Sequence, residues 1–398
     1  MGNATGDFNT SRATYLNSLY QQVFGATSLS TLATGDEVTN FVNTFPTNGW
    51  DPLFTTISNM IGRTLMAVRP YRGKLDTIEV DRREYGWITR KLSFVEDTVK
   101  PNLTFTLTDG LSIDPWIVNK PKVLETQRYG GGQISRILTI YEDQIKGAFS
   151  SRSGLDEFLS GMLTWFNSMV EQDREQYKRT ALINYMGCLS QYPDRCIFLI
   201  DEYNQATGST LDNVTVFAPA NFEGFVQWLY GFIQKLMGLL SERSFKYHLN
   251  PTTASPIQGY IARQTRYEDM RCFLNTGFKE DMTARVVANT FNKDELKEVK
   301  YEGINFWQSI DSPTDLDVTV TPLDTAIMEA TAQTVSLQNV FGVIFDRDAL
   351  AVSYMNDNTG NSPYNQRGRY VNMIHNEDVC ISQDLTENGI LLILDKAP

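Results

Sequence analysis

The sequence has little of the chemistry that most metal proteins and disulfide-rich proteins use. It contains two histidines, His248 and His375, and four cysteines. The cysteines form no C-x-x-C pair and lie at no ligand spacing from a histidine. Neither a structural zinc site nor a disulfide framework is expected, and the cysteines are predicted to be reduced thiols, as in a cytosolic protein. No cofactor is expected either.

The common catalytic motifs are also missing from the sequence. There is no G-x-S-x-G, no H-E-x-x-H, no Walker loop and no EF-hand spacing. His248 could act as a general base with a distant Ser or Cys, but a structural histidine is favoured. Asp346 and Asp348 fit a turn better than a cation site, and Asp384 and Glu387 are expected in a solvated hairpin. We therefore predict no enzymatic activity.

Long uninterrupted hydrophobic runs are absent too. No signal peptide is visible at the N-terminus. The most apolar stretch, residues 222–240, is interrupted by Gln227, Gln234 and Lys235 at helical spacing. This pattern indicates a buried helix rather than a membrane span, so no membrane partner is expected.

Positive charge is in deficit, with a formal net charge of -12. An acidic chain repels the phosphate backbone, which argues against a general nucleic-acid binder. The densest basic stretch, residues 63–91, interleaves its basic side chains with acidic ones, as in a protein contact surface. The residues predicted to make contacts between subunits are Arg72, Lys74, Arg82, Arg83 and Glu84.

A long helix is the dominant predicted element, over residues 153–189. Apolar residues recur at spacings of three and four through its first half and place one stripe along the helix. At about 1.5 Å per residue such a helix spans roughly 50 Å, the length of a strut. Trp165 and Phe166 are both expected to be buried on the stripe. Lys178, in the charged second half, is expected to tolerate alanine unless it meets a neighbour.

The segments before this helix are predicted to be an arm and a strand-rich excursion. Residues 1–65 hold three weak helical patterns with too little apolar surface for a core, so an extended arm is expected. From about residue 71 to 145 the hydrophobic period is two, as in β-strands. Three consecutive glycines in this part lack phosphate-loop spacing and are expected to supply a flexible backbone: Gly130, Gly131 and Gly132.

After the long helix, strands and helices alternate. Buried strands are predicted near residues 196–200 and 214–217, followed by a helix from Asn221, as its cap, to about residue 240. A helix near 281–291 and a strand near 304–308 complete one α+β domain. A set of terminal strands is expected to pair back beside the long helix. Residues 340–353 hold a strand broken by a polar turn and then a second apolar run, and further strands are predicted at 371–374, 379–383 and 389–394.

This order of parts resembles the major capsid protein of tailed bacteriophages, which has the Johnson or Hong Kong ninety-seven fold. The run PKVLETQRYGGGQISRILTIYEDQIKGAFSSRSGLDEFLSGMLTWFNSMVEQDREQY resembles the loop return and spine helix of small podoviruses related to phage phi-twenty-nine. YEDMRCFLNTGFKEDMTARVVANTF resembles another domain of that family. The family's added immunoglobulin-like domain is expected to be missing here, because the sequence stops after GILLILDKAP.

The resemblance implies an α+β capsid fold with five segments. They are an N-terminal arm (1–70), an E-loop (71–147), a P-domain with the spine helix (148–200), an A-domain (201–338) and a return to the P-domain with C-terminal strands (339–398). The three glycines would be the hinge of the E-loop. The resemblance supplies no catalytic residue.

The resemblance also implies a structural function and a set of partners. Copies of the chain would build the hexamers and pentamers of an icosahedral shell around double-stranded DNA, without sequence-specific binding. Scaffold and portal proteins are expected partners, and assembly is expected in the host bacterial cytoplasm. An encapsulin-like compartment is the alternative for the same fold. An enzyme with a long helical strut is a third class of protein, for which the sequence offers no catalytic motif as evidence.

Overall fold

The computed structural model describes residues 73–80, 88–95, 109, 116, 118, 120–129, 132–142, 152–250, 261–277, 301–324 and 329–395. The arm, the helix predicted near 281–291 and most of the E-loop tip lie outside these residues. Six of the eight predicted contact and hinge residues also lie outside them: Arg72, Arg82, Arg83, Glu84, Gly130 and Gly131.

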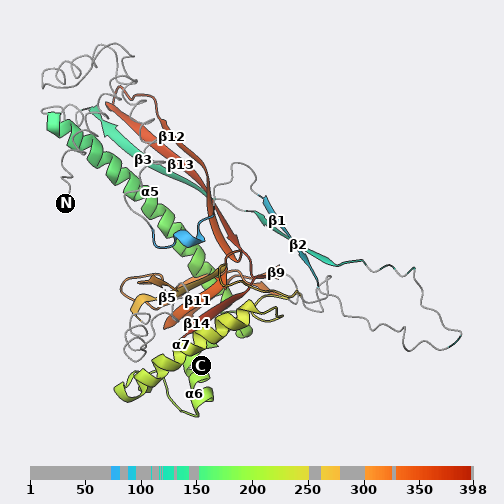
Figure 1. Cartoon of the computed structure of the whole chain (residues 1–398). Coiled ribbons are helices and arrows are strands. Elements are labelled where there is room, and N and C mark those ends of the chain that lie inside the picture. The colour runs from blue at the N-terminus through green and yellow to red at the C-terminus, as the bar shows by residue number, and fades with distance from the viewer. Residues whose placement is uncertain are drawn as a thin grey trace, which may run out of the picture.

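A single 38-residue helix, α5 (Arg152–Leu189), runs through the molecule (Figure 1). The predicted helix is confirmed to within one residue. Phe166 is fully buried as expected, but Trp165 is 48% exposed, so its predicted burial is wrong. Successive residues of a helix point about 100° apart, and only one of these two neighbours can face the sheet that α5 covers.

The first half of α5 lies along a three-stranded antiparallel sheet of order β12-β13-β3 (Figure 1). Its strands are β3 (Gly132–Tyr141), β12 (Leu350–Asn361) and β13 (Tyr370–Gln383). The two strands predicted at 371–374 and 379–383 are thus one continuous strand. Polar residues between them, such as Glu377, interrupt the sequence pattern, but Glu377 is buried against α5.

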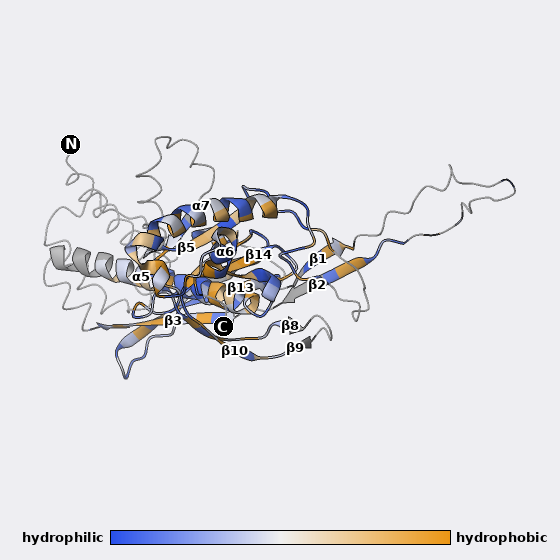
Figure 2. Ribbon diagram, turned by 90° about the horizontal axis from the view of Figure 1, so that it is seen from below, coloured by the Kyte–Doolittle hydropathy of each residue, from blue (hydrophilic) through white to orange (hydrophobic). Residues whose placement is uncertain are grey.

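The second half of α5 packs on a five-stranded sheet of order β4-β14-β11-β5-β6. Helices α6 (Leu199–Thr207) and α7 (Pro219–Ser241) pack on the opposite face (Figure 2). Because both faces are covered, every residue of β11 and β14 is buried. The strands are β4 (Cys196–Phe198), β5 (Met270–Asn275), β6 (Tyr301–Ile304), β11 (Val340–Asp346) and β14 (Gly389–Ile393).

Three details of this region differ from the prediction. The strand predicted at 196–200 ends at Phe198, where α6 takes over, and the one at 214–217 is a short 3-10 helix, η4 (Thr215–Phe217). Asn221 does not cap α7, which begins at Pro219, because the fixed backbone of proline suits the first helical position. The strand predicted near 304–308 is β6, which ends at Ile304.

Two-stranded ribbons complete the described structure. β1 (Ile88–Phe94) and β2 (Val123–Tyr129) form an antiparallel ribbon that leaves the body of the molecule (Figure 1). β7 (Leu316–Val320) and β10 (Gln333–Leu337) form another, which packs on the end of α5. Two short elements are η1 (Asp76–Ile78) and the pair β8 (Leu323–Asp324) and β9 (Glu329–Ala330).

Gly342→Ala is expected to lower the free energy of unfolding by about 1–3 kcal/mol or more, because the core cannot take the added methyl group. A Cβ atom at Gly342 would lie 2.5 Å from the backbone oxygen of Phe273 on β5 and 2.6 Å from a methyl of Leu274. Gly132→Ala is the control, since its Cβ would meet nothing within 4 Å. Urea denaturation of both variants measures the difference, and equal losses would contradict it.

Candidate functional site

The charged second half of α5 is buried rather than solvated. Glu171, Arg174, Glu175 and Lys178 all lie in the interior, with Lys178 only 1% exposed. The prediction that Lys178 would tolerate alanine held only for a side chain that meets no neighbour, and this condition fails because its ammonium contacts Asp76 and Glu79. Burying a charge is costly unless it is paired, so each of these side chains needs a partner from another element.

Arg174 joins α5 to the three-stranded sheet. Its Nε donates to Oε2 of Glu377 at 3.0 Å, and its Nη2 donates to the second carboxylate oxygen of the same residue. Nη1 donates to Glu171 at 3.3 Å, one turn earlier on α5. The guanidinium lies 5.0 Å from the ring centroid of Tyr354, whose hydroxyl donates to the backbone oxygen of Arg174 at 3.0 Å. This two-pronged pairing fixes the angle of α5 on β12 and β13.

Lys178 joins α5 to the segment that leads toward β1. Its ammonium donates to Asp76 Oδ1 at 2.9 Å and Glu79 Oε2 at 3.1 Å. Burial by itself would lower the pKa of Lys178, but hydrogen bonds and charge from the two carboxylates outweigh it and raise the pKa. Glu175 accepts a hydrogen bond from the backbone N–H of Leu75 at 3.4 Å. Residues 73–80 are thus clamped to the helix.

Lys74 is the one predicted contact residue within the described part of the chain. Its exposed ammonium donates to Oδ1 of Asn305 at 3.1 Å in the same subunit. The adjacent Gly73 lies where a Cβ would clash with Glu175 Oε2, so only glycine fits without a shift. The contact role of Lys74 between subunits stays a prediction.

A second cluster forms at the acidic turn, defined as residues 384–388 between β13 and β14. Asp384 and Glu387 are buried, so their predicted place in a solvated hairpin is wrong. Lys91 of β1 donates to Asp384 Oδ2 at 2.6 Å and also to Glu387. The buried guanidinium of Arg195 donates to the backbone oxygens of residues 385, 387 and 389. These hydrogen bonds hold the backbone of the turn in place.

Glu387→Gln is expected to flatten the dependence of stability on pH. Burial raises the pKa of Glu387 above its ordinary value of 4.5, although Lys91 and Arg263 oppose the rise. The folded protein therefore holds this proton more tightly than the unfolded chain. The stabilisation is fully present below pH 4.5 and is lost as the pH rises through the raised pKa.

Urea unfolding of wild type and Glu387→Gln at a series of pH values above the ordinary carboxyl pKa measures this effect. Wild type should lose stability relative to the variant as the pH rises. Parallel curves for the two proteins would show that Glu387 does not titrate in the folded state as described.

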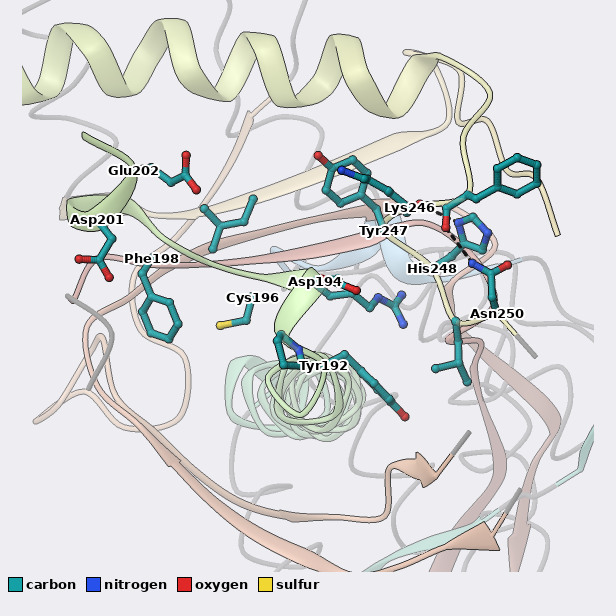
Figure 3. Close-up of a pocket in the computed structure, with 15 residues that line it drawn as sticks. Tyr192, Asp194, Cys196, Phe198, Asp201, Glu202, Lys246, Tyr247, His248 and Asn250 are labelled. Atoms are coloured by element: carbon teal, nitrogen blue, oxygen red, sulfur yellow. Dashed lines mark hydrogen bonds between the residues drawn. The ribbon is translucent and has the colours of Figure 1, made fainter. Parts of the chain in front are cut away.

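A pocket of about 660 Å³ lies between β4, the start of α6 and residues 245–250 (Figure 3). Figure 3 shows His248 beside Asn250 and away from Cys196. The ring nitrogens of His248 contact the backbone oxygens of Lys246, at 2.7 Å, and Ile261. Burial lowers the pKa of His248 and raises that of Cys196 to about 11, so the thiol is protonated at neutral pH. The pocket does not pair a base with a nucleophile, and His248 has the structural role that was favoured.

The ribbon of β1 and β2 has one buried and one exposed side. Ser93, Val95 and Leu124 are buried on the side toward the body. On the other side three large apolar side chains are exposed, and we call them the ribbon face: Leu92, Phe94 and Val123. Ile137 and Tyr141 on β3 are also exposed. Exposed apolar groups of this kind indicate contact with another protein surface.

Gly132 is the one predicted hinge residue that the structure describes. It is the first residue of β3, opposite Val379 of β13. β2 ends at Tyr129 in the ribbon, and β3 begins in the three-stranded sheet, so the three glycines connect two separate sheets. This position fits a hinge, and the hinge role of the three glycines stays a prediction.

Sequence reasoning missed the most important charged partners. The sequence gives no signal for the buried contacts of Glu377 and Arg195, because each is a single charged residue within an otherwise ordinary segment. The available signal was the helical spacing of four charged residues, which places them on one side of α5. Arg174, Glu175 and Lys178 follow Glu171 by three, four and seven residues. The same spacing is also typical of a solvated face, and only the packing separates the two.

The described residues show neither a membrane-spanning helix nor a cluster of metal ligands. No helix among them is long and apolar enough to cross a bilayer. Within the same residues, no group of three or more His, Cys, Asp or Glu side chains lies close enough to hold a metal ion.

Comparison with known proteins gives a consistent result. Residues 13–393 match the model of the family described as Phi29-like phage major capsid protein. The fold is similar to the capsid structure of Staphylococcus phage Andhra, with a TM-score of 0.52, 13% identity, and coverage of 81% of this chain and 83% of that one.

A second similar chain comes from a structure of the head fiber and inner core protein gp22 of native bacteriophage P68. Its TM-score is 0.54 at 13% identity, and the match covers 81% of this chain and 84% of that one. No curated protein sequence matches this chain.

Proposed function

Since this chain belongs to the family of Phi29-like phage major capsid proteins, we propose that its copies form the hexamers and pentamers of an icosahedral head enclosing double-stranded DNA. The protein is a structural capsid subunit with the Hong Kong ninety-seven type of fold, and its place is the virion capsid. The match over residues 13–393 carries the proposal. An encapsulin-like compartment is not favoured.

The five segments named from the resemblance form part of the proposal. The ribbon of β1 and β2 supports an E-loop within residues 71–147, and α5 along a long sheet supports the spine helix of a P-domain. The five-stranded sheet draws strands from 148–200, 201–338 and 339–398. The last three segments therefore share one core, and their boundaries mark chain order rather than units that fold separately.

Contact between subunits is proposed at the ribbon face. An E-loop that reaches the next subunit makes a head-to-tail contact, which closes into a ring when repeated around an axis. The three exposed apolar side chains of the ribbon face support this arrangement, since a monomer gains nothing from exposing them. Five further residues remain proposed contacts between subunits: Arg72, Lys74, Arg82, Arg83 and Glu84.

The acidic balance supports a shell that encloses DNA without binding it tightly. A net charge of -12 gives the phosphate backbone little overall attraction. Scaffold and portal proteins, and assembly in the host bacterial cytoplasm, are further parts of the proposal that follow from the family.

Electron microscopy of the purified full-length protein tests the proposed function. Closed shells built of hexamers and pentamers are the expected result. A protein that stays monomeric under all assembly conditions, including addition of its scaffold, would overturn it. Nucleic acid rather than a protein cargo inside native particles would separate a phage head from a compartment.

Shells of this family are expected to assemble in a precursor form and then to expand as they mature. Replacing Gly130, Gly131 and Gly132 together by Ala is expected to slow this expansion more than the first assembly. Alanine removes backbone states that glycine allows, so a hinge there would swing less readily. The single change at Gly132 meets no steric obstacle and is the control. Time-resolved microscopy should show precursor shells that persist in the triple variant. Maturation at the wild-type rate would leave the glycines as a simple loop.

A further inference from the structure

The ribbon of β1 and β2 is attached to the body by one compact set of contacts. Within the described residues, its two strands pair with each other and with no third strand. On the body-facing side, Lys91 pairs with Asp384 and Glu387, and Ser93 Oγ accepts a hydrogen bond from Arg263 at 2.7 Å. An isolated two-stranded ribbon is marginally stable in water, so its direction depends on these contacts.

The acidic turn that receives Lys91 is held rigidly from several sides. Asp384 Oδ1 accepts hydrogen bonds from the backbone N–H and the hydroxyl of Thr386 at 2.9 and 2.7 Å. Asn388 donates to Thr265, whose hydroxyl donates to Asp346 at 2.6 Å. Arg195 holds the backbone oxygens of the turn. The turn is fixed by these hydrogen bonds, whereas the ribbon has fewer contacts with the body. The ribbon is therefore the part expected to move.

The two carboxylates are more deeply buried than the ammonium that pairs with them. The side chain of Lys91 is 21% exposed, against 1% for Asp384 and 11% for Glu387. If the ribbon swings away, the ammonium of Lys91 returns to water easily. The carboxylates of Asp384 and Glu387 stay in the turn, where they have little contact with solvent. Arg263 stays near Glu387, with Nε 3.5 Å from Oε2. Release is thus opposed mainly by the acids that are left behind.

We propose that Lys91 and the acidic turn form a latch that sets the direction of the E-loop before subunits meet. While it is closed, the ribbon face points away from the body and is available to a neighbouring subunit. Setting the direction in advance lowers the conformational entropy lost on association. Any rearrangement that swings the ribbon must break this charge pair. The latch rests on the proposed capsid function, and Lys91 acts as a positioning residue.

Lys91→Met tests the latch in the unassembled full-length subunit by hydrogen exchange. Methionine keeps most of the side-chain length and removes the charge. The ribbon amides of 88–94 and 123–129 should exchange at least about tenfold faster, which corresponds to about 1.4 kcal/mol of lost local protection. Amides of β11 and β14 report the stability of the whole subunit and should change less than the ribbon amides. Lys120→Met, an exposed lysine beside the same ribbon, is the matched control and should stay within about twofold of wild type.

A triple variant separates the latch from general stability. Lys91→Met alone leaves two buried acids without their ammonium, which would destabilise the whole subunit. Adding Asp384→Asn and Glu387→Gln removes those charges and keeps acceptors for Thr386 and Arg263. The triple variant should recover the wild-type melting temperature while its ribbon still exchanges fast. A ribbon as slow as wild type would show that the apolar contacts of Val95 hold it, and would overturn the latch.

Assembly kinetics connect the latch to the shell. Light scattering should show slower shell formation by the triple variant than by wild type or Lys120→Met. Equal rates, or ribbon exchange in Lys91→Met within about twofold of wild type, would overturn the proposal. If wild type itself forms no shells, the proposed function fails, while the exchange experiment on the subunit still decides whether the latch exists.

Discussion

Arg174→Met should lower the free energy of unfolding by about 3–5 kcal/mol, because it takes the guanidinium away from the buried carboxylate of Glu377. Methionine fills a similar space, so the loss reports the charge rather than a cavity. The variant also removes the two-pronged contact that fixes α5 on the sheet. Chemical denaturation of the unassembled subunit, followed by circular dichroism, measures the effect.

Two further variants make this result interpretable. Arg174→Met combined with Glu377→Met removes the two charges of this pair and should recover part of the loss, since apolar side chains can replace a buried ion pair at little cost. Glu171 keeps its charge and still lacks its contact with Arg174, so the recovery is incomplete. Arg136→Met breaks a more exposed pair with Asp173 between β3 and the same helix, and should cost only about 0–1 kcal/mol. Equal losses at Arg174 and Arg136 would mean that the burial of Arg174 has no energetic weight.

Phe166→Ala should also cost about 3–5 kcal/mol, whereas Trp165→Ala should cost about 1 kcal/mol or less. The ring of Phe166 is fully buried and meets His375 of β13 edge to face at a centroid distance of 6.0 Å. Its removal leaves a cavity between α5 and the sheet. Trp165 is the larger side chain but is 48% exposed, so its truncation removes less buried surface.

Thermal unfolding of the two alanine variants compares adjacent positions on one helix. The expected difference in melting temperature has the sign opposite to that expected from side-chain size alone. A larger loss at Trp165 in the unassembled subunit would mean that α5 is rotated about its axis relative to the described packing. A defect of Trp165→Ala that appears only in shells would instead locate a contact with a neighbouring subunit.

Together these contacts divide the subunit into a stiff body and an attached ribbon. α5 is fixed to the three-stranded sheet by Arg174 and to residues 73–80 by Lys178, and its end lies in the shared core of the five-stranded sheet. The ribbon is attached through Lys91 and a small apolar cluster around Val95. A shell built from such subunits can be rigid in its wall and adjustable at its contacts.

The sequence by itself determined the elements whose signal is local. The apolar spacing of residues 153–189 defined α5 to within a residue, because a helical stripe repeats along the chain. The apolar runs at β11 and β14 predicted buried strands for the same reason. The order of these elements, with the quoted segments, was enough to indicate the capsid family.

Only the tertiary structure decided which charges are buried. Lys178 meets Asp76 from 102 residues away, Arg174 meets Glu377 from 203, and Lys91 meets Asp384 from 293. A charged residue on a helix or at a turn carries no local sign of such a partner, so Asp384 was expected in a solvated hairpin and Lys178 was expected to tolerate alanine. The cost of burying a charge depends on what lies opposite it, and that is fixed only when distant parts of the chain pack together.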